Sequence, residues 1–100
     1  MKTATAAKKL AELGHQTRLE IFRHLIKGGN KGVSVGEIQS TLGIPGSTLS
    51  HHISRLVSVG LVKQKREGTT LYCIPKYKEL ERLIEFLQEE CCVNESCSPD

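Results

Sequence analysis

The chain has 100 residues, of which 25% are charged and 38% hydrophobic, and it contains no tryptophan. This length allows one small domain, which a second copy of the chain would help to stabilise. No apolar run is long enough to span a bilayer, and the N-terminal stretch lacks the apolar core of a signal peptide. We therefore expect a cytoplasmic protein with no membrane partner.

The net charge of +3 is unevenly distributed along the chain. Residues 1–75 hold eleven Lys and Arg against four acids, a balance of +7, whereas residues 76–100 hold three against seven, a balance of −4. A basic body with an acidic tail suggests a polyanionic partner, although charge alone fits a solvated mixed surface equally well.

Helical periodicity predicts four helices in the first 60 residues. Apolar side chains recur at helical intervals in residues 4–13 and again in residues 15–27. Residues 34–43 open with a serine that is followed three residues later by a glutamate, which is a capping box and predicts a short third helix. A tight connector leads to a longer helix over residues 47–60, with a core stripe at Leu49, Ile53, Leu56 and Val57.

The pattern changes from helical to alternating after Gly60. Residues 61–66 and 69–74 predict a β-hairpin with its turn at Glu67-Gly68, and residues 76–90 return to helical spacing. The fold class is therefore mainly α with a β-hairpin, in the order helix, helix, helix, helix, hairpin, helix. A short helix, a tight turn, a longer helix and a hairpin are the parts of a winged helix-turn-helix.

The fourth helix is the candidate for reading DNA. Its predicted exposed face carries Ser47, Thr48, Ser50, His51, His52, Ser54 and Arg55. Hydroxyls near a helix N-terminus can bind base edges or phosphates, and an arginine can pair with phosphate or guanine. The hairpin adds three cations for the phosphate backbone, Lys63, Lys65 and Arg66.

Each of these residues alone fits a hydrated helix face. Together with the absence of acids between Glu37 and Glu67, they favour DNA binding. The adjacent His51 and His52 do not readily share a metal ion, because neighbouring helical side chains point about 100° apart. No metal-hydrolase motif, phosphate-binding glycine loop or activated nucleophile is present, so an enzyme is not expected.

The segments "HQTRLEIFRHL" and "STLSHHISRL" followed by "GLV" and "REG" resemble the ArsR/SmtB winged-helix repressors over residues 5–90. The resemblance implies a homodimer, joined through the first and last helices, that binds an inverted-repeat operator in double-stranded DNA and is released by an inducer. Two departures stand out. His15-Gln16 replaces the usual helix cap and proline, and Pro45-Gly46 leaves no side chain at position 46 to contact a base.

The resemblance also directs attention to residues 91–100, a tail that follows the domain at 1–90. Cys91, Cys92 and Cys97 resemble the cysteines of arsenite-responsive members, and neither the cysteine pattern of the third helix nor the histidine of the last helix found in other members is present. Three thiolates suit trivalent arsenic or antimony, so arsenite or antimonite is the expected inducer and no cofactor is needed for DNA binding. Zinc prefers a fourth ligand.

Several alternatives stay open. A disulfide between Cys97 and either Cys91 or Cys92 would make the same repressor respond to oxidants, and zinc or cadmium could act as the inducer. The tail cysteines could also have no role. Cys73, in the second hairpin strand, fits a small buried residue better than a ligand. A winged helix that binds a protein instead of DNA is a further possibility.

Overall fold

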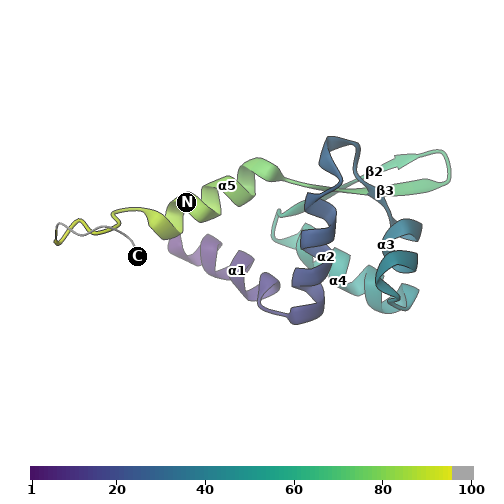
Figure 1. The fold of residues 1–100 in the computed structure, drawn as a ribbon, viewed down its shortest axis with the longest axis horizontal. Coiled ribbons are helices and arrows are strands. Elements are labelled where there is room, and N and C mark those ends of the chain that lie inside the picture. Colours follow the sequence, from purple (N-terminus) through teal and green to yellow (C-terminus); the bar gives the residue numbers. More distant parts are fainter. Residues whose placement is uncertain (96–100) are drawn as a thin grey trace.

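The computed structural model describes residues 1–95, and Figure 1 shows helices gathered around a small sheet. The elements are α1 (Thr3–Leu13), α2 (Gln16–Ile26), the 3-10 helix η1 (Gly29–Lys31), β1 (Val33–Ser34), α3 (Val35–Leu42), α4 (Gly46–Ser58), β2 (Val62–Glu67), β3 (Thr70–Pro75) and α5 (Tyr77–Gln88). This order confirms the predicted winged helix-turn-helix. The last helix ends two residues earlier than the predicted position 90.

The sheet has one strand more than the predicted hairpin. Strand β3 lies in the centre and pairs with β2 and β1, both antiparallel, in the order β1-β3-β2. In β1, Val33 pairs with Cys73 and Ser34 pairs with Tyr72. A strand of two residues carries too little alternation to be recognised in a sequence, which is why β1 was not predicted.

Local sequence signals define the helix-turn-helix. The Ser34 hydroxyl accepts a hydrogen bond from the Glu37 backbone N–H at 3.1 Å, so the predicted N-cap of α3 is confirmed. Gly43 ends that helix with a φ of +65°, a left-handed conformation that glycine adopts without a steric penalty. Pro45 then holds an extended conformation, and α4 begins at the next residue.

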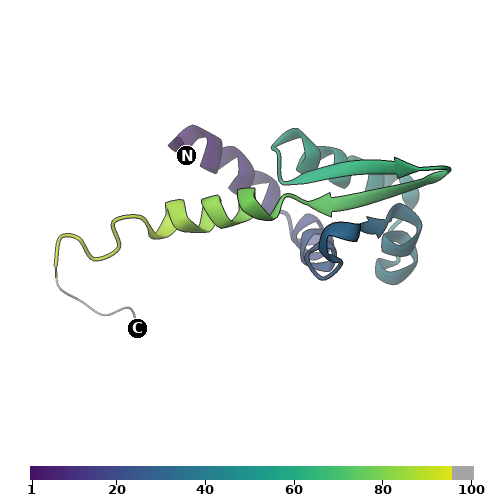
Figure 2. The same cartoon turned by 90° about the horizontal axis from the view of Figure 1, so that it is seen from above.

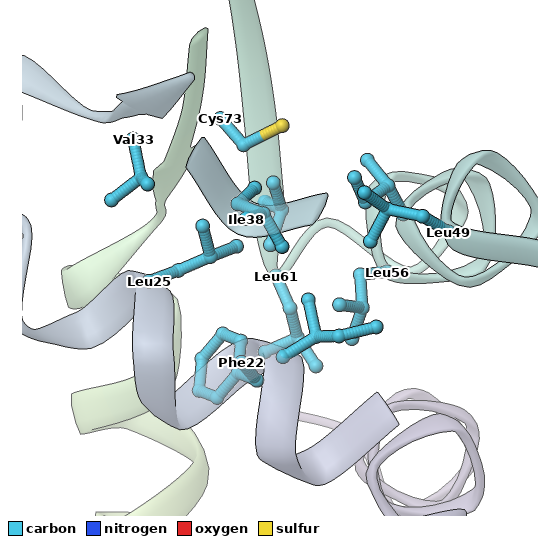
Figure 3. Packing of buried hydrophobic residues seen from close by; sticks show 11 residues of the cluster. Phe22, Leu25, Val33, Ile38, Leu49, Leu56, Leu61 and Cys73 are labelled. Atoms are coloured by element: carbon cyan, nitrogen blue, oxygen red, sulfur yellow. The ribbon is translucent and has the colours of Figure 1, made fainter. Parts of the chain in front are cut away.

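The core lies where α2, α3 and α4 pack against the sheet, as Figure 3 shows. Leu25, Ile38, Leu49, Leu56 and Leu61 are all fully buried. The predicted stripe of α4 is confirmed at its three main positions, since Leu49, Ile53 and Leu56 are 0–2% exposed. The prediction that Val57 is the fourth buried residue of this stripe is wrong, because Val57 is 38% exposed at the edge of the core.

Helices α1 and α5 lie at one end of the molecule and the β2–β3 hairpin projects from the other, as Figures 1 and 2 show together. The long axis measures 54 Å against 25 and 23 Å for the other two. Helix α1 buries Ala6 and α5 buries Leu83, and Leu13 and Leu80 pack partly buried against the core, but three large apolar side chains of these helices are exposed. The exposed ones are Leu10, Ile84 and Leu87.

Candidate DNA-binding surface and cysteine cluster

Helix α4 presents a polar face next to its buried stripe. Ser47, Thr48, Ser50, His51 and Ser54 are exposed, as the sequence predicted. The first three lie in the opening turns of the helix, where unpaired backbone N–H groups and the helix dipole also favour a negatively charged partner. This end of α4 can therefore offer hydroxyl groups, an imidazole and backbone N–H groups to a nucleic acid.

The prediction that His52 belongs to this exposed face is wrong. Its side chain points toward α1 and α2 and is 6% exposed, and its Nδ1 accepts a hydrogen bond from Arg18 Nε at 3.3 Å. Burial lowers the pKa of His52 from its ordinary value, and the charges of Arg18, His15 and His51 lower it further. His52 is therefore a packing residue in the middle of α4.

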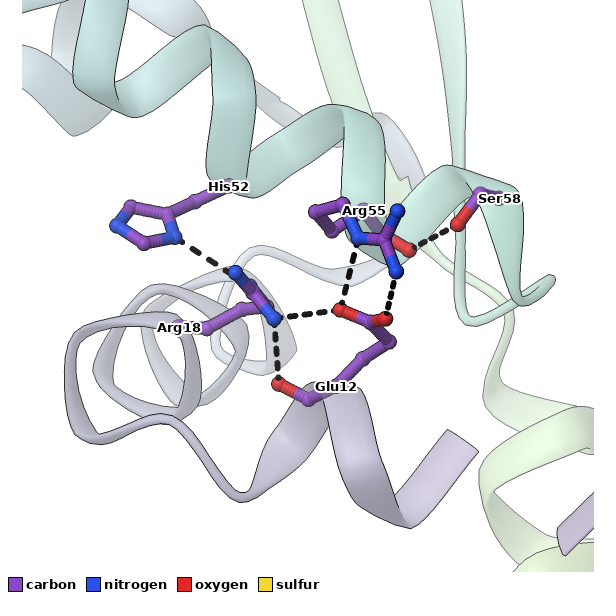
Figure 4. Close-up of polar contacts among 5 residues, drawn as sticks. All are labelled: Glu12, Arg18, His52, Arg55 and Ser58. Carbon is purple, nitrogen blue, oxygen red and sulfur yellow. Dashed lines mark hydrogen bonds and ion pairs between the residues drawn. The ribbon is translucent and has the colours of Figure 1, made fainter. Parts of the chain in front are cut away.

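Arg55 is half exposed, but its guanidinium is turned back onto the protein, as Figure 4 shows. Its Nη2 donates to Glu12 Oε1 at 2.5 Å and its Nε donates to Glu12 Oε2 at 3.2 Å. This bidentate bond lowers the pKa of Glu12 and raises that of Arg55, so both groups are charged. In this arrangement, Arg55 points away from the approach that the sequence assigned to it.

A groove of about 770 Å³ runs between α4 and the β2–β3 hairpin. Hydroxyl groups dominate its polar lining, contributed by Ser34, Ser50, Ser54, Thr69 and Thr70. Gln64 and Arg66 close it on the hairpin side. A groove lined by hydroxyls and a guanidinium is suited to a sugar–phosphate backbone.

The three predicted hairpin cations lie on different faces of the sheet. Side chains alternate along β2, so Arg66 shares the groove with α4 while Lys63 and Lys65 point to the opposite face. There Lys65 forms an ion pair with Glu67 at 3.1 Å and lines a hollow with Lys31. The structure therefore brings only one of the three hairpin cations to the predicted recognition helix.

The cysteine pair lies just beyond α5, outside any regular helix. Cys91 is exposed, and its Sγ is 3.6 Å from Cys92 Sγ. Cys92 has a φ of +59°, and Glu90 one of +60°, so the backbone turns sharply at both residues. Cys97, the third predicted ligand, lies outside the described residues. Within residues 1–95, no group of three or more His, Cys, Asp or Glu side chains could hold a metal ion.

Cys73 takes no part in this cluster. It is fully buried in the central strand, where its sulfur accepts a weak hydrogen bond from Gln64 Nε2 at 3.8 Å. Burial raises the pKa of its thiol, so it stays protonated. The prediction that Cys73 is a small buried residue is confirmed.

Comparison with known proteins adds a second line of observation to this geometry. Residues 13–65 match a family described as a helix-turn-helix domain. The chain is 35% identical over 86 residues to ArsR2 of Halobacterium salinarum, which is named as an arsenical resistance operon repressor, and this covers 86% of the chain and 71% of the relative. The chain belongs to the ArsR/SmtB family of winged-helix transcriptional regulators.

Solved structures agree with this assignment. Reduced HlyU from Vibrio cholerae N16961 superposes with a TM-score of 0.71 at 31% identity, covering 90% of this chain and 92% of HlyU. An ArsR-like transcriptional regulator from Rhodococcus sp. RHA1 superposes with a TM-score of 0.74 at 25% identity, covering 85% and 77% of the two chains. This ArsR/SmtB protein is therefore a regulator with a DNA-binding fold and not an enzyme.

No pattern in the sequence pointed to the polar residues that hold α4 in this regulator. Lys9, Glu12 and Arg18 are all buried, and they join α1 and α2 to the recognition helix and its C-cap. On the sequence, they are charged residues in surface-type helices, and Glu12 is 43 positions away from its partner Arg55.

Among the helices of the described chain, none has the length and apolarity required to cross a bilayer.

Proposed function

We propose that this regulator is a dimeric repressor that binds operator DNA and is released when trivalent arsenic or antimony binds to Cys91, Cys92 and Cys97. The observation that carries the DNA-binding part is the exposed hydroxyl face of α4 beside the groove that contains Arg66. The observation that carries the inducer part is the close approach of two cysteine sulfurs directly after α5.

The proposed DNA contacts come from two elements. Ser47, Thr48, Ser50 and His51 extend from α4 toward the major groove, and Arg66 holds the phosphate backbone from the hairpin. Lys63 and Lys65 would contact phosphate only where the duplex passes the other face of the hairpin. Hydroxyl and imidazole contacts give register and base preference, and the cation adds a salt-dependent affinity.

The proposed dimer buries the outward faces of α1 and α5. Leu10, Ile84 and Leu87 are 39%, 47% and 59% exposed in the single chain, and a 100-residue domain gains stability by covering such side chains. We expect sedimentation velocity to show a dimer, and Ile84→Glu to shift it toward monomer. The matched control is Leu19→Glu, on the exposed face of α2, which should leave the dimer intact.

The cysteine geometry supports a thiophilic inducer. The Cys91 and Cys92 sulfurs are 3.6 Å apart, close enough for both to bind one ion in the reduced protein. Three thiolates neutralise a trivalent ion, and soft sulfur ligands suit such ions. The name of the Halobacterium salinarum relative, an arsenical resistance operon repressor, supports the same choice.

The test is a fluorescence-anisotropy titration of the reduced protein on its own upstream DNA, with arsenite, antimonite, zinc and cadmium added separately. We expect arsenite or antimonite to release the DNA, and Cys91→Ser, Cys92→Ser and Cys97→Ser each to abolish that release. Cys73→Ala is the matched control and should respond like the wild type, because its thiol is buried. Release of the Cys92→Ser protein at an unchanged arsenite concentration would contradict the proposed site.

A second candidate is a thiol-redox switch in the same tail. One of the similar solved structures is HlyU of Vibrio cholerae in a reduced form. HlyU of Vibrio cholerae is also named a transcriptional activator. Release of DNA by diamide, with no effect of arsenite or antimonite, would favour this function. A reporter fusion in a strain that lacks the regulator then decides between repression and activation.

A further inference from the structure

A largely buried polar cluster joins the recognition helix α4 to α1 and α2, and the DNA-binding surface does not use it. Its centre is the carboxylate of Glu12 on α1, whose side chain is 9% exposed. This carboxylate accepts hydrogen bonds from Arg18 of α2 at 2.5 Å and from both nitrogens of the Arg55 fork on α4. Figure 4 shows both guanidiniums pointing at the same carboxylate.

Arg18 extends the cluster. It also donates to the Glu12 backbone carbonyl at 3.4 Å and to His52 Nδ1 at 3.3 Å. Helix α4 is therefore held twice, at His52 through Arg18 and at Arg55 through Glu12. Because His52 Nδ1 accepts a hydrogen bond from Arg18, this nitrogen carries no proton and the imidazole is neutral, so the cluster contains two cations and one anion.

A third polar contact lies at the C-terminal end of α4. Lys9, one turn before Glu12 on α1, is 5% exposed and donates to the carbonyl of Val59, at the C-cap of α4. A cation at this position also interacts favourably with the negative end of the helix dipole. Helix α1 thus contacts α4 at two points of its C-terminal end, through Arg55 in the last turn and through Val59 at the C-cap, while Arg18 of α2 contacts the middle of α4 at His52.

The geometry of Arg55 decides which role it can have. A planar fork that makes two bonds to one carboxylate is a strong, directional contact, and it is different in kind from the loose contact of a surface lysine. If Arg55 moved to a phosphate, the Glu12 carboxylate would lose both of these bonds inside a nearly buried site. The guanidinium is therefore committed to the protein.

We infer that Glu12 fixes the orientation of the recognition helix through Arg55, and that Arg55 is a positioning residue for operator binding and not a phosphate contact. The inference rests on the proposed DNA-binding function. It assigns to α1, which the proposed dimer places at its interface, a direct connection to the helix that reads DNA. Operator affinity then depends on Glu12, although this residue does not touch the duplex.

The test uses Arg55→Gln, Glu12→Gln and the double variant that carries both substitutions. These three proteins are compared with Arg66→Gln, which removes a cation from the groove. For each protein, operator affinity is measured at several salt concentrations, together with affinity for an unrelated duplex. A lost phosphate contact lowers the salt slope by about 0.9 per protomer and weakens binding to every sequence alike. A lost positioning contact weakens operator binding alone.

We expect Arg55→Gln to weaken operator binding about fivefold or more, within the usual range of coupling between sites. Its salt slope and its affinity for the unrelated duplex should equal those of the wild type. Glu12→Gln should give a similar loss, and the double variant should be no worse than either single variant, because both remove the same contact. Arg66→Gln should lower the slope.

Simple loss of folded protein is distinguishable, because it would reduce binding to both duplexes equally and would appear in the far-UV circular dichroism. If Glu12→Gln fails to fold, the salt slope of Arg55→Gln decides alone. A slope that falls in Arg55→Gln as much as in Arg66→Gln would overturn the inference, as would full operator affinity in a folded Glu12→Gln protein. If the wild type shows no operator binding at all, it is the proposed function that fails.

Discussion

Arg66 and Lys65 are neighbours on β2 with the same charge, yet the sheet turns them to opposite faces. Arg66 lines the groove beside α4, whereas Lys65 lies on the far side in an ion pair with Glu67. The substitutions Arg66→Gln and Lys65→Gln each remove one positive charge and keep a side chain of similar length. They therefore form a matched pair that tests whether DNA follows the groove.

The size of the effect can be worked out from the number of charges removed. If each Arg66 neutralises one phosphate, a dimer loses two contacts, and the slope of log affinity against log salt falls by about 1.8. Between 50 and 200 mM salt, the wild type would then lose about 12-fold more affinity than Arg66→Gln. Lys65→Gln should change the slope by less than half as much, because its side chain points away from the groove.

The assay is fluorescence anisotropy of a labelled upstream duplex, titrated with each protein at four or more salt concentrations. The protein is reduced and no inducer is added, so that the cysteine tail does not alter the DNA affinity of any variant. The titrations include a low salt concentration at which both variants bind the duplex measurably. Circular dichroism checks that the hairpin substitutions leave the fold unchanged.

A salt slope that falls equally in the two variants, or more in Lys65→Gln, would contradict binding of DNA along the groove. An equal fall would mean that the duplex contacts both faces of the hairpin. A larger fall for Lys65 would place the DNA on the Lys31 side and leave the groove unoccupied.

Three further predictions concern stability and reactivity. Folding lowers the pKa of His52 from its ordinary 6.5, so the unfolded chain binds a proton at this residue more readily than the folded chain does. Protonation of His52 therefore costs the folded state no stability above pH 6.5, and it lowers the free energy of unfolding as the pH falls below that value. Urea unfolding from pH 7.5 to 5.5 should show a smaller decline for His52→Asn than for the wild type, and an equal decline would contradict the burial argument. Ser34→Ala should lower the free energy of unfolding by about 1 kcal/mol through loss of the α3 cap, whereas Ser47→Ala, which removes no N-cap bond, should not. In the reduced native protein, iodoacetamide should modify Cys91 well before Cys73, as read by peptide mass spectrometry, and comparable rates would show that Cys73 is not shielded.

The order of the helices was predictable because each helix is marked by sequence signals that lie within a few residues of one another. Periodic apolar residues give the helices, Ser34 and Gly43 mark the two ends of α3, and the change of period after Gly60 marks the hairpin. These signals act over a few residues, so they are legible in one sequence. Strand β1 was missed because it is defined by its pairing with β3, which lies about 40 positions away.

The assignment of α4 side chains to the exposed face failed at one position for an instructive reason. Leu49, Ile53 and Leu56 set the buried stripe, and residue 52 completes the spacing i, i+3, i+4, i+7 that begins at Leu49. The spacing therefore places His52 inside, but its polar character suggested a place outside. Residues such as Glu12 and Arg18 carry no comparable spacing signal, since their partners come from other helices and only the packed fold brings them together.

The bond between Glu12 and Arg55 has a consequence for anyone who redesigns this regulator. Exchanging recognition helices between related proteins is an obvious route to a new operator sequence. Here the grafted segment would contain position 55 but leave position 12 behind, 43 residues away on α1. A graft that replaces Arg55 with an uncharged residue removes the bidentate partner of Glu12, so the donor's residue at position 12 has to be transplanted together with its helix.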